Sequence, residues 1–174
     1  RRLLPLPMNE ELNNLITALR EELTQYGEVL ALMQEQQELI INRSANDLLL
    51  NLNAVNEQME RVAATRQQRE LCRQQLVASL GGTDETTFRE MTAMLPAEVQ
   101  PLLDALVQEI NQLLQNIQKW LRQNHMLLQR SLDLMQTIMK SMFPSSSAVA
   151  GTYGRSGQVS PVNPPPSSLY EGII

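Results

Sequence analysis

The sequence predicts an all-α fold: an antiparallel bundle of three long helices plus one short connecting helix, with a disordered C-terminal tail. Leu, Gln, Glu, Met and Arg dominate the chain, and these unbranched side chains lose little rotamer freedom in a helix. Aromatic residues make up only 3% of the 174 residues, so we expect a core of aliphatic side chains and Met. Apolar residues also recur at alternating spacings of three and four, the pattern of helices with one buried face.

The first long helix is predicted over residues 9–41, after a Pro-rich extension at residues 1–8. Its apolar residues alternate in steps of four and three, with Gln37 as the one polar step: Leu12, Ile16, Leu19, Leu23, Tyr26, Leu30, Met33 and Ile40. This heptad pattern indicates one buried face along the whole helix. The extension is too short and too rich in Pro for the apolar core of a signal peptide, so we expect no secretion signal there.

A second long helix is predicted after the break at residues 42–47, where Ser44 and Asp47 are expected to form a capping box. Its apolar stripe comprises Leu48, Leu52, Val55, Met59, Val62, Leu76 and Leu80. Arginines occupy the stripe in the middle of this helix. We therefore expect the register to shift there, so that Leu71 and Cys72 supply the buried side chains.

A short connecting helix is expected between Gly81-Gly82 and Pro96. The Gly pair ends the second helix, because Gly adopts the left-handed conformation without steric cost. Thr83 or Asp84 is expected to cap the short helix, whose apolar side consists of Phe88, Met91, Met94 and Leu95. Pro96 or Pro101 can begin the next helix without loss of a hydrogen bond, since a first-turn N–H has no helical partner.

The last long helix, over residues 97–142, carries two neighbouring apolar stripes. The first follows heptad spacing with Asn124 and Ser131 as polar interruptions: Leu103, Leu106, Ile110, Leu113, Ile117, Trp120, Leu127, Leu134 and Ile138. The second repeats every seven residues: Val107, Leu114, Leu121, Leu128, Met135 and Met142. A face three positions wide in each heptad suits a helix that packs against two neighbours.

The last helix and the segment after it are also unusual in length and composition. At about 1.5 Å per residue the last helix is about 70 Å long and the first two about 50 Å, so we expect its end to extend past its partners. Residues 144–174 are rich in Ser, Pro and Gly and cannot bury much apolar area. The predicted organisation is therefore an extension at 1–8, a helical bundle at 9–143 and a flexible tail at 144–174.

The residue types in the sequence argue against catalysis and favour a binding function. His125 and Cys72 are the only residues of their types, which excludes a zinc site of several Cys and His ligands, and we expect no cofactor. The net charge of −5, without a basic cluster, argues against nucleic acid as a partner. Without a run of about 18 apolar residues we expect no membrane insertion, and the single Cys fits a reducing compartment, the cytoplasm.

The end of the last helix is the candidate partner-binding surface. Apolar residues crowd it: Met126, Leu127, Leu128, Leu134, Met135, Ile138, Met139, Met142 and Phe143. They can be ordinary core or a face left for a partner, and both interpretations stay open at this point. Met is flexible and polarisable, which suits a surface that adapts to an amphipathic partner helix. In the tail, Tyr153, Leu169, Tyr170, Ile173 and Ile174 are further apolar anchors.

Four sequence elements together resemble the FlgN family of flagellar export chaperones over about residues 8–160. They are Met8-Asn-Glu-Glu-Leu12, the Asn46-Asp47 break, the Arg-rich end of the second helix and Tyr153-Gly-Arg-Ser-Gly157. The order of two long helices, a Gly-Gly break, a short helix, a very long helix and a Ser/Pro/Gly tail is also similar. The chain departs from the family pattern at Pro5–Pro7 and Pro164–Pro166, which leaves the role of Tyr170 open.

The resemblance implies a non-enzymatic cytoplasmic chaperone of hook–filament junction proteins, FlgK and FlgL, before type III export. It implies that the C-terminal part holds the helical C-terminal segment of the cargo and docks at the export gate component FlhA. By position, Leu127 to Phe143 would be the cargo surface and Tyr153 a gate-docking residue. Two alternatives remain: a structural coiled-coil protein that forms a homo-oligomer, and a chaperone for a non-flagellar type III substrate.

Overall fold

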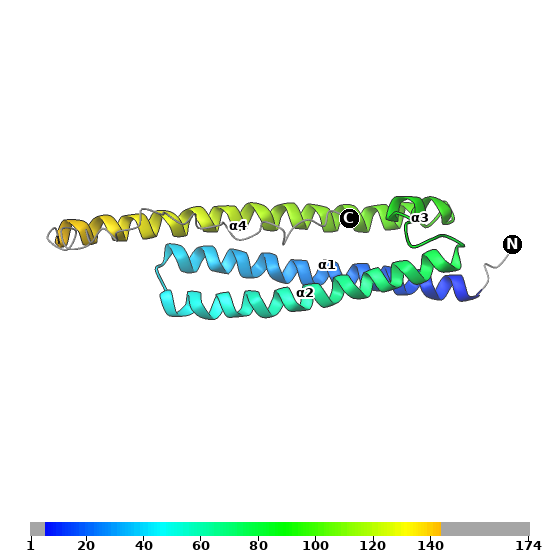
Figure 1. Ribbon diagram of the computed structural model, residues 1–174, viewed down its shortest axis with the longest axis horizontal. Coiled ribbons are helices and arrows are strands. Elements are labelled where there is room, and N and C mark those ends of the chain that lie inside the picture. Colours follow the sequence, from blue (N-terminus) through cyan, green and yellow to red (C-terminus); the bar gives the residue numbers. More distant parts are fainter. Residues whose placement is uncertain (1–5, 144–174) are drawn as a thin grey trace, which may run out of the picture. The chain divides into compact units, whose positions relative to one another are not determined.

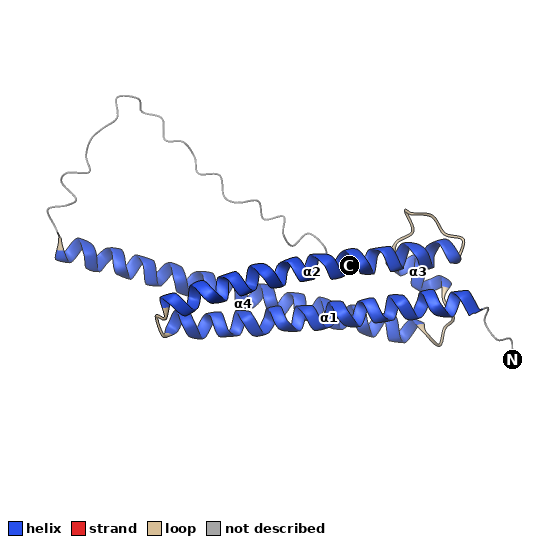
Figure 2. Ribbon diagram, turned by 90° about the horizontal axis from the view of Figure 1, so that it is seen from below, coloured by secondary structure: helices blue, strands red, loops and turns tan. Residues whose placement is uncertain are grey.

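The computed structural model describes residues 6–143, with side chains from Glu10 onward, and confirms the all-α fold. The helices are α1 (Leu6–Ile41), α2 (Ala45–Ser79), α3 (Phe88–Met94) and α4 (Gln100–Met142), and no strand occurs among these residues (Figures 1 and 2). The chain divides into two compact units, one ending at Asn124 and the other beginning at His125. The predictions for the tail, Tyr153 and Tyr170 included, lie outside the described residues.

Helices α1 and α2 form an antiparallel hairpin and lie side by side in both ribbon views (Figures 1 and 2). α1 begins three residues earlier than predicted, and Pro7 fits in its first turn because the N–H it lacks has no helical partner there. α1 ends in a Schellman motif in which Arg43 has a left-handed φ of 55°. The N–H groups of Arg43 and Ser44 donate to the carbonyls of Ile40 and Leu39, at 3.2 and 3.1 Å.

The predicted capping box of Ser44 and Asp47 is wrong. Ser44 is the N-cap of α2, but its side chain makes no capping hydrogen bond. The Schellman motif holds its backbone at a ψ of 79°, outside the extended conformation from which an N-cap oxygen reaches the N3 amide. The turn between α1 and α2 is therefore fixed by backbone hydrogen bonds.

The Gly81-Gly82 pair ends α2 as predicted. Gly81 has a φ of 78°, and the N–H groups of Gly81 and Gly82 donate to the carbonyls of Ala78 and Val77 at 3.1 and 2.9 Å. This is a second Schellman motif. A Cβ on Gly82 would lie 2.7 Å from Val77 Cγ1, so both glycines are required by the turn.

Two Gly→Ala substitutions are expected to change the free energy of unfolding in opposite directions. Gly81→Ala should lower it by about 1–2 kcal/mol, because an L side chain is strained in the left-handed region. Gly27→Ala should raise it by about 0.5–1 kcal/mol, since Ala is the better helix former and nothing lies within 4 Å of the added Cβ. Urea denaturation followed by circular dichroism measures both, and two shifts of the same sign would contradict this account.

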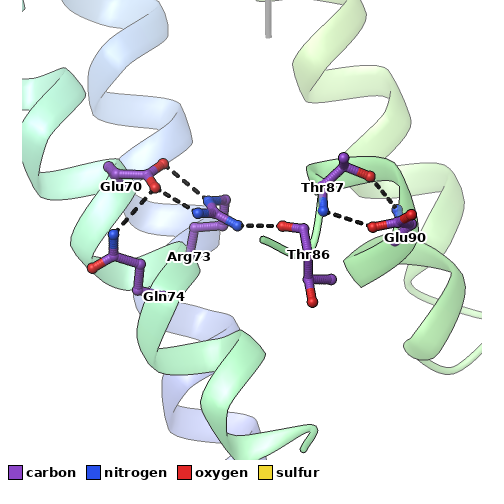
Figure 3. A network of polar contacts seen from close by, with 6 residues as sticks. All are labelled: Glu70, Arg73, Gln74, Thr86, Thr87 and Glu90. Carbon is purple, nitrogen blue, oxygen red and sulfur yellow. Dashed lines mark hydrogen bonds and ion pairs between the residues drawn. The ribbon is translucent and has the colours of Figure 1, made fainter. Parts of the chain in front are cut away.

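Helix α3 is capped by Thr87, and the predicted caps Thr83 and Asp84 are wrong. Thr87 Oγ1 accepts from the Glu90 N–H at 3.3 Å, and Glu90 Oε2 accepts from the Thr87 N–H at 2.8 Å, a complete capping box (Figure 3). The helix starts at Phe88, so the earlier residues lie in the preceding loop. Arg73 ties this loop to α2: it donates to the Thr86 carbonyl at 2.6 Å and pairs with Glu70 (Figure 3).

One hydrophobic core joins the four helices within the first unit. Its fully buried apolar side chains are Leu15, Leu19, Leu76, Met91, Leu103, Ile110 and Ile117. α1 buries more than its predicted stripe, because the heptad positions of Leu15 and Val29 also face the core. Both α1 and α4 therefore present the wide faces that helices with two neighbours need.

The predicted register of α2 is only partly correct. Val62, Cys72 and Leu76 are buried, but Leu52 and Leu71 are 42% and 48% exposed. Buried Asn51 and Gln58 take the positions expected for Leu52 and Met59. A buried polar side chain is stable only when its hydrogen bonds are made, and both of these side chains find partners on α1.

Candidate partner-binding surface

The last part of α4 exposes an unusually large apolar face. Every side chain from His125 to Phe143 is exposed except Leu127 and Ser131, which are half-buried. The exposed apolar residues include Leu128, Leu132, Leu134, Met135, Ile138, Met139, Met142 and Phe143. Met135 and Met142 are 60% and 66% exposed. A contiguous exposed apolar patch often marks a protein interaction site, whereas single exposed apolar residues are ordinary.

These apolar side chains share one side of the helix. At about 100° per residue, eight residues from Leu127 to Met142 fall within an arc of about 160° bounded by Leu134 and Leu132. Arg130, Asp133 and Lys140 lie on the opposite side by the same geometry. We call this arc the apolar face: Leu127, Leu128, Leu132, Leu134, Met135, Ile138, Met139 and Met142.

The structure brings seven of the nine predicted binding residues together on the apolar face. Phe143 directly follows the helix and is exposed, and Tyr153 lies outside the described residues. Met126 is also exposed, but it projects on the side opposite the face. Leu132 was missed because it belongs to neither stripe. Its spacing of four from Leu128 and seven from Met139 was the signal that could have found it.

A polar layer connects the three long helices just before the apolar face. Buried Asn124 on α4 donates to the Met33 carbonyl at 2.8 Å and to Gln36 Oε1 at 3.0 Å, both on α1. Gln36 Nε2 donates to Asn51 Oδ1 on α2 at 3.2 Å, and Asn51 Nδ2 donates to the Leu32 carbonyl at 3.0 Å. A buried amide at a heptad core position fixes the register of packed helices.

A buried ion pair joins α1 and α2 in the middle of the hairpin. Glu22 is 1% exposed, and its Oε2 lies 3.0 Å from Arg69 Nε. Tyr26 Oη donates to Glu22 Oε1 at 3.2 Å. Burial raises the pKa of Glu22, while Arg69, Tyr26 and Arg66 act in the opposite direction. Burial and the neighbouring Glu22 carboxylate raise the pKa of Tyr26 to about 12.

In the described part of the chain, other titratable groups include a thiol, a histidine and a second ion pair. Cys72 is a free, buried thiol, and His125 is exposed. Among residues 6–143, no three His, Cys, Asp or Glu side chains are grouped so that they could hold a metal ion. The pKa of Glu70 is lowered by its hydrogen bonds with Arg73, which is what a structural ion pair produces. The described helices also include none with the length and apolar character needed to cross a bilayer.

Comparison with known proteins supports one family. The family model described as FlgN protein matches residues 8–161, nearly the whole chain. Neither the curated proteins nor the solved structures yield a match. The matched range contains all of the apolar face and the tail residue Tyr153.

Proposed function

The chain belongs to the FlgN family of flagellar chaperones, and on that premise we propose that it binds hook–filament junction proteins of the FlgK and FlgL type for type III export. It acts in the cytoplasm, before the cargo enters the export channel. It is a binding protein and not an enzyme. The observation that carries this proposal is the apolar face at the end of α4, which is exposed in the chain alone.

The chemistry of the apolar face supports a helical cargo segment. An amphipathic helix that lays its own apolar stripe along the face would bury both surfaces, at about 25 cal/mol for each Å² removed from water. The terminal helix of a subunit that assembles with copies of itself carries such a stripe. Coverage of the stripe prevents premature assembly, and release requires no ATP because the contact is reversible.

The tail has a second role in this proposal. Tyr153, in the Gly-Thr-Tyr-Gly-Arg-Ser-Gly segment, docks at the export gate component FlhA. A large aromatic side chain in a segment of small residues is a suitable anchor, since a few such contacts carry most of the energy of an interface. Cargo and gate then contact different parts of the chain, so one chaperone can hold the cargo while it docks.

Calorimetry with the C-terminal helices of FlgK and FlgL tests the proposal. Full-length protein and a version that ends at Phe143 should both bind one cargo helix with micromolar or tighter affinity. Tyr153→Ala should leave this affinity unchanged and weaken binding to FlhA. Absence of heat with either cargo, together with a stable cargo-free dimer in sedimentation equilibrium, would overturn the proposal. That result would favour a self-associating coiled coil.

A further inference from the structure

We propose that the apolar face holds two helices of one cargo molecule side by side, and not a single cargo helix. This inference rests on the proposed function and specifies the shape of its cargo. The observation that carries it is the width of the face. It also depends on the continuity of the face with the part of α4 that packs in the core.

The apolar face is too wide for one partner helix. A helix that packs against a single partner needs two apolar positions in each heptad, whereas a helix with two neighbours needs three. The arc from Leu134 to Leu132 measures about 160° at about 100° per residue. Side chains at its centre, Met135 and Met142, are flanked by apolar residues on both sides. One partner helix would therefore leave an apolar edge in water.

Earlier in α4, the same pattern faces a core that two other helices help to build. Over residues 113–121 the core side of α4 spans about 120°, from Trp120 to Leu114, at about 100° per residue. These residues pack against a core to which both α1 and α2 contribute. The heptad stripes of this part continue past Asn124 into the apolar face without a change of register. A continuation of equal or greater width calls for an equal number of partner helices.

The apolar face divides into two flanks on either side of Met135 and Met142. One flank consists of Leu127, Leu134 and Ile138, and the other of Leu128, Leu132 and Met139. Each flank offers three aliphatic or Met side chains, enough for one amphipathic helix. Two helices of the same cargo molecule can fill both flanks with a single loss of translational freedom, because the second contact is intramolecular.

Variants of each flank, tested against two probes, decide between one helix and two. The variants are Leu134→Gln/Ile138→Gln on the first flank and Leu132→Gln/Met139→Gln on the second. Met126→Gln on the opposite side of α4 is the control. The probes are full-length hook–filament junction protein and its isolated C-terminal helix, measured by calorimetry. We expect each flank variant to weaken one-to-one binding of full-length cargo at least tenfold, and only one of them to weaken binding of the isolated helix.

Three results would overturn the inference. Equal loss of isolated-helix affinity in both variants would mean that one helix covers the whole face. Loss of full-length cargo affinity in only one variant would mean that the other flank takes no part. If the unaltered chaperone bound neither probe, the proposed function would fail and this inference with it. The first two results leave the proposed function intact, so the failures are distinguishable.

Discussion

Met135→Glu/Ile138→Glu should lower the affinity for cargo at least 100-fold without loss of helix content or thermal stability. Both side chains are exposed in the chain alone, at 60% and 45%, so the folded bundle does not depend on them. In the complex they would be buried, where each apolar side chain contributes about 1.5–3 kcal/mol. A buried carboxylate without a partner adds a further penalty. At about 1.4 kcal/mol for each factor of ten, the sum exceeds a 100-fold loss.

Met126→Glu is the matched control for this variant. It adds one negative charge, half that of the double variant, to the same helix, about 2.5 to 3.3 turns away, at a side chain that is also exposed. Because Met126 projects opposite the apolar face, its affinity for cargo should stay within about threefold of the unaltered protein, the range of surface substitutions. Equal losses in both variants would show that the charge acts through the helix or the net charge. In that case the apolar face is not the binding surface.

Hydrophobic periodicity was sufficient to predict the helices and the apolar C-terminal part of α4. Spacings of three and four predicted the long helices, and the Gly81-Gly82 pair predicted the end of α2 because a left-handed residue is needed there. Apolar residues such as Leu134 and Ile138 continue a stripe that is buried at Ile110 and Ile117. The stripe cannot distinguish core from interface, since both obey the same spacing. Exposure in the folded chain is what separates them.

Periodicity failed where the core is polar. Four polar residues interrupt the apolar pattern of the sequence and are nevertheless buried: Glu22, Gln36, Asn51 and Gln58. Asn51, Gln58 and Gln36 form hydrogen bonds with another helix. Glu22 lies opposite the Arg69 cation of α2, and these partners are many residues away in the sequence. A pattern within one helix has no information about such partners. The register of α2 was therefore predicted along Leu52 when it runs along Asn51.

Two sets of buried polar contacts thus specify how the helices of the bundle pack. They differ from the apolar face in the precision of the packing that they require. The Asn124–Gln36–Asn51 layer and the Glu22–Arg69 pair both require a particular register, because a shift by one residue would leave buried polar groups without partners. The apolar face makes no such demand, since Met and Leu accept several packings. The part of α4 with a fixed packing register and the proposed binding surface therefore follow one another along one helix.

Arg69→Met should lower the free energy of unfolding at pH 7.5 by about 3–5 kcal/mol, because it leaves the buried Glu22 carboxylate without its countercharge. The loss should shrink as the pH falls. Burial raises the pKa of Glu22 in the folded state above its ordinary value of 4.5. Between pH 4.5 and this raised pKa, the folded state therefore binds more protons than the unfolded state. Stability then decreases as pH rises through this window. Without Arg69 the pKa of Glu22 rises further, and the window widens toward neutral pH.

Glu22→Gln/Arg69→Met is the decisive companion variant. It removes the buried charge and its partner together, and an amide oxygen at position 22 could still accept from Tyr26 Oη. Replacement of a whole buried ion pair is often neutral or stabilising. Stability at pH 7.5 should therefore return to within about 1 kcal/mol of the unaltered protein, with no dependence on pH from this site. Urea denaturation from pH 5 to 8 measures all three proteins. If the double variant were no more stable than Arg69→Met, the loss would come from the packing of the Arg69 side chain, and an unpaired carboxylate would not be its cause.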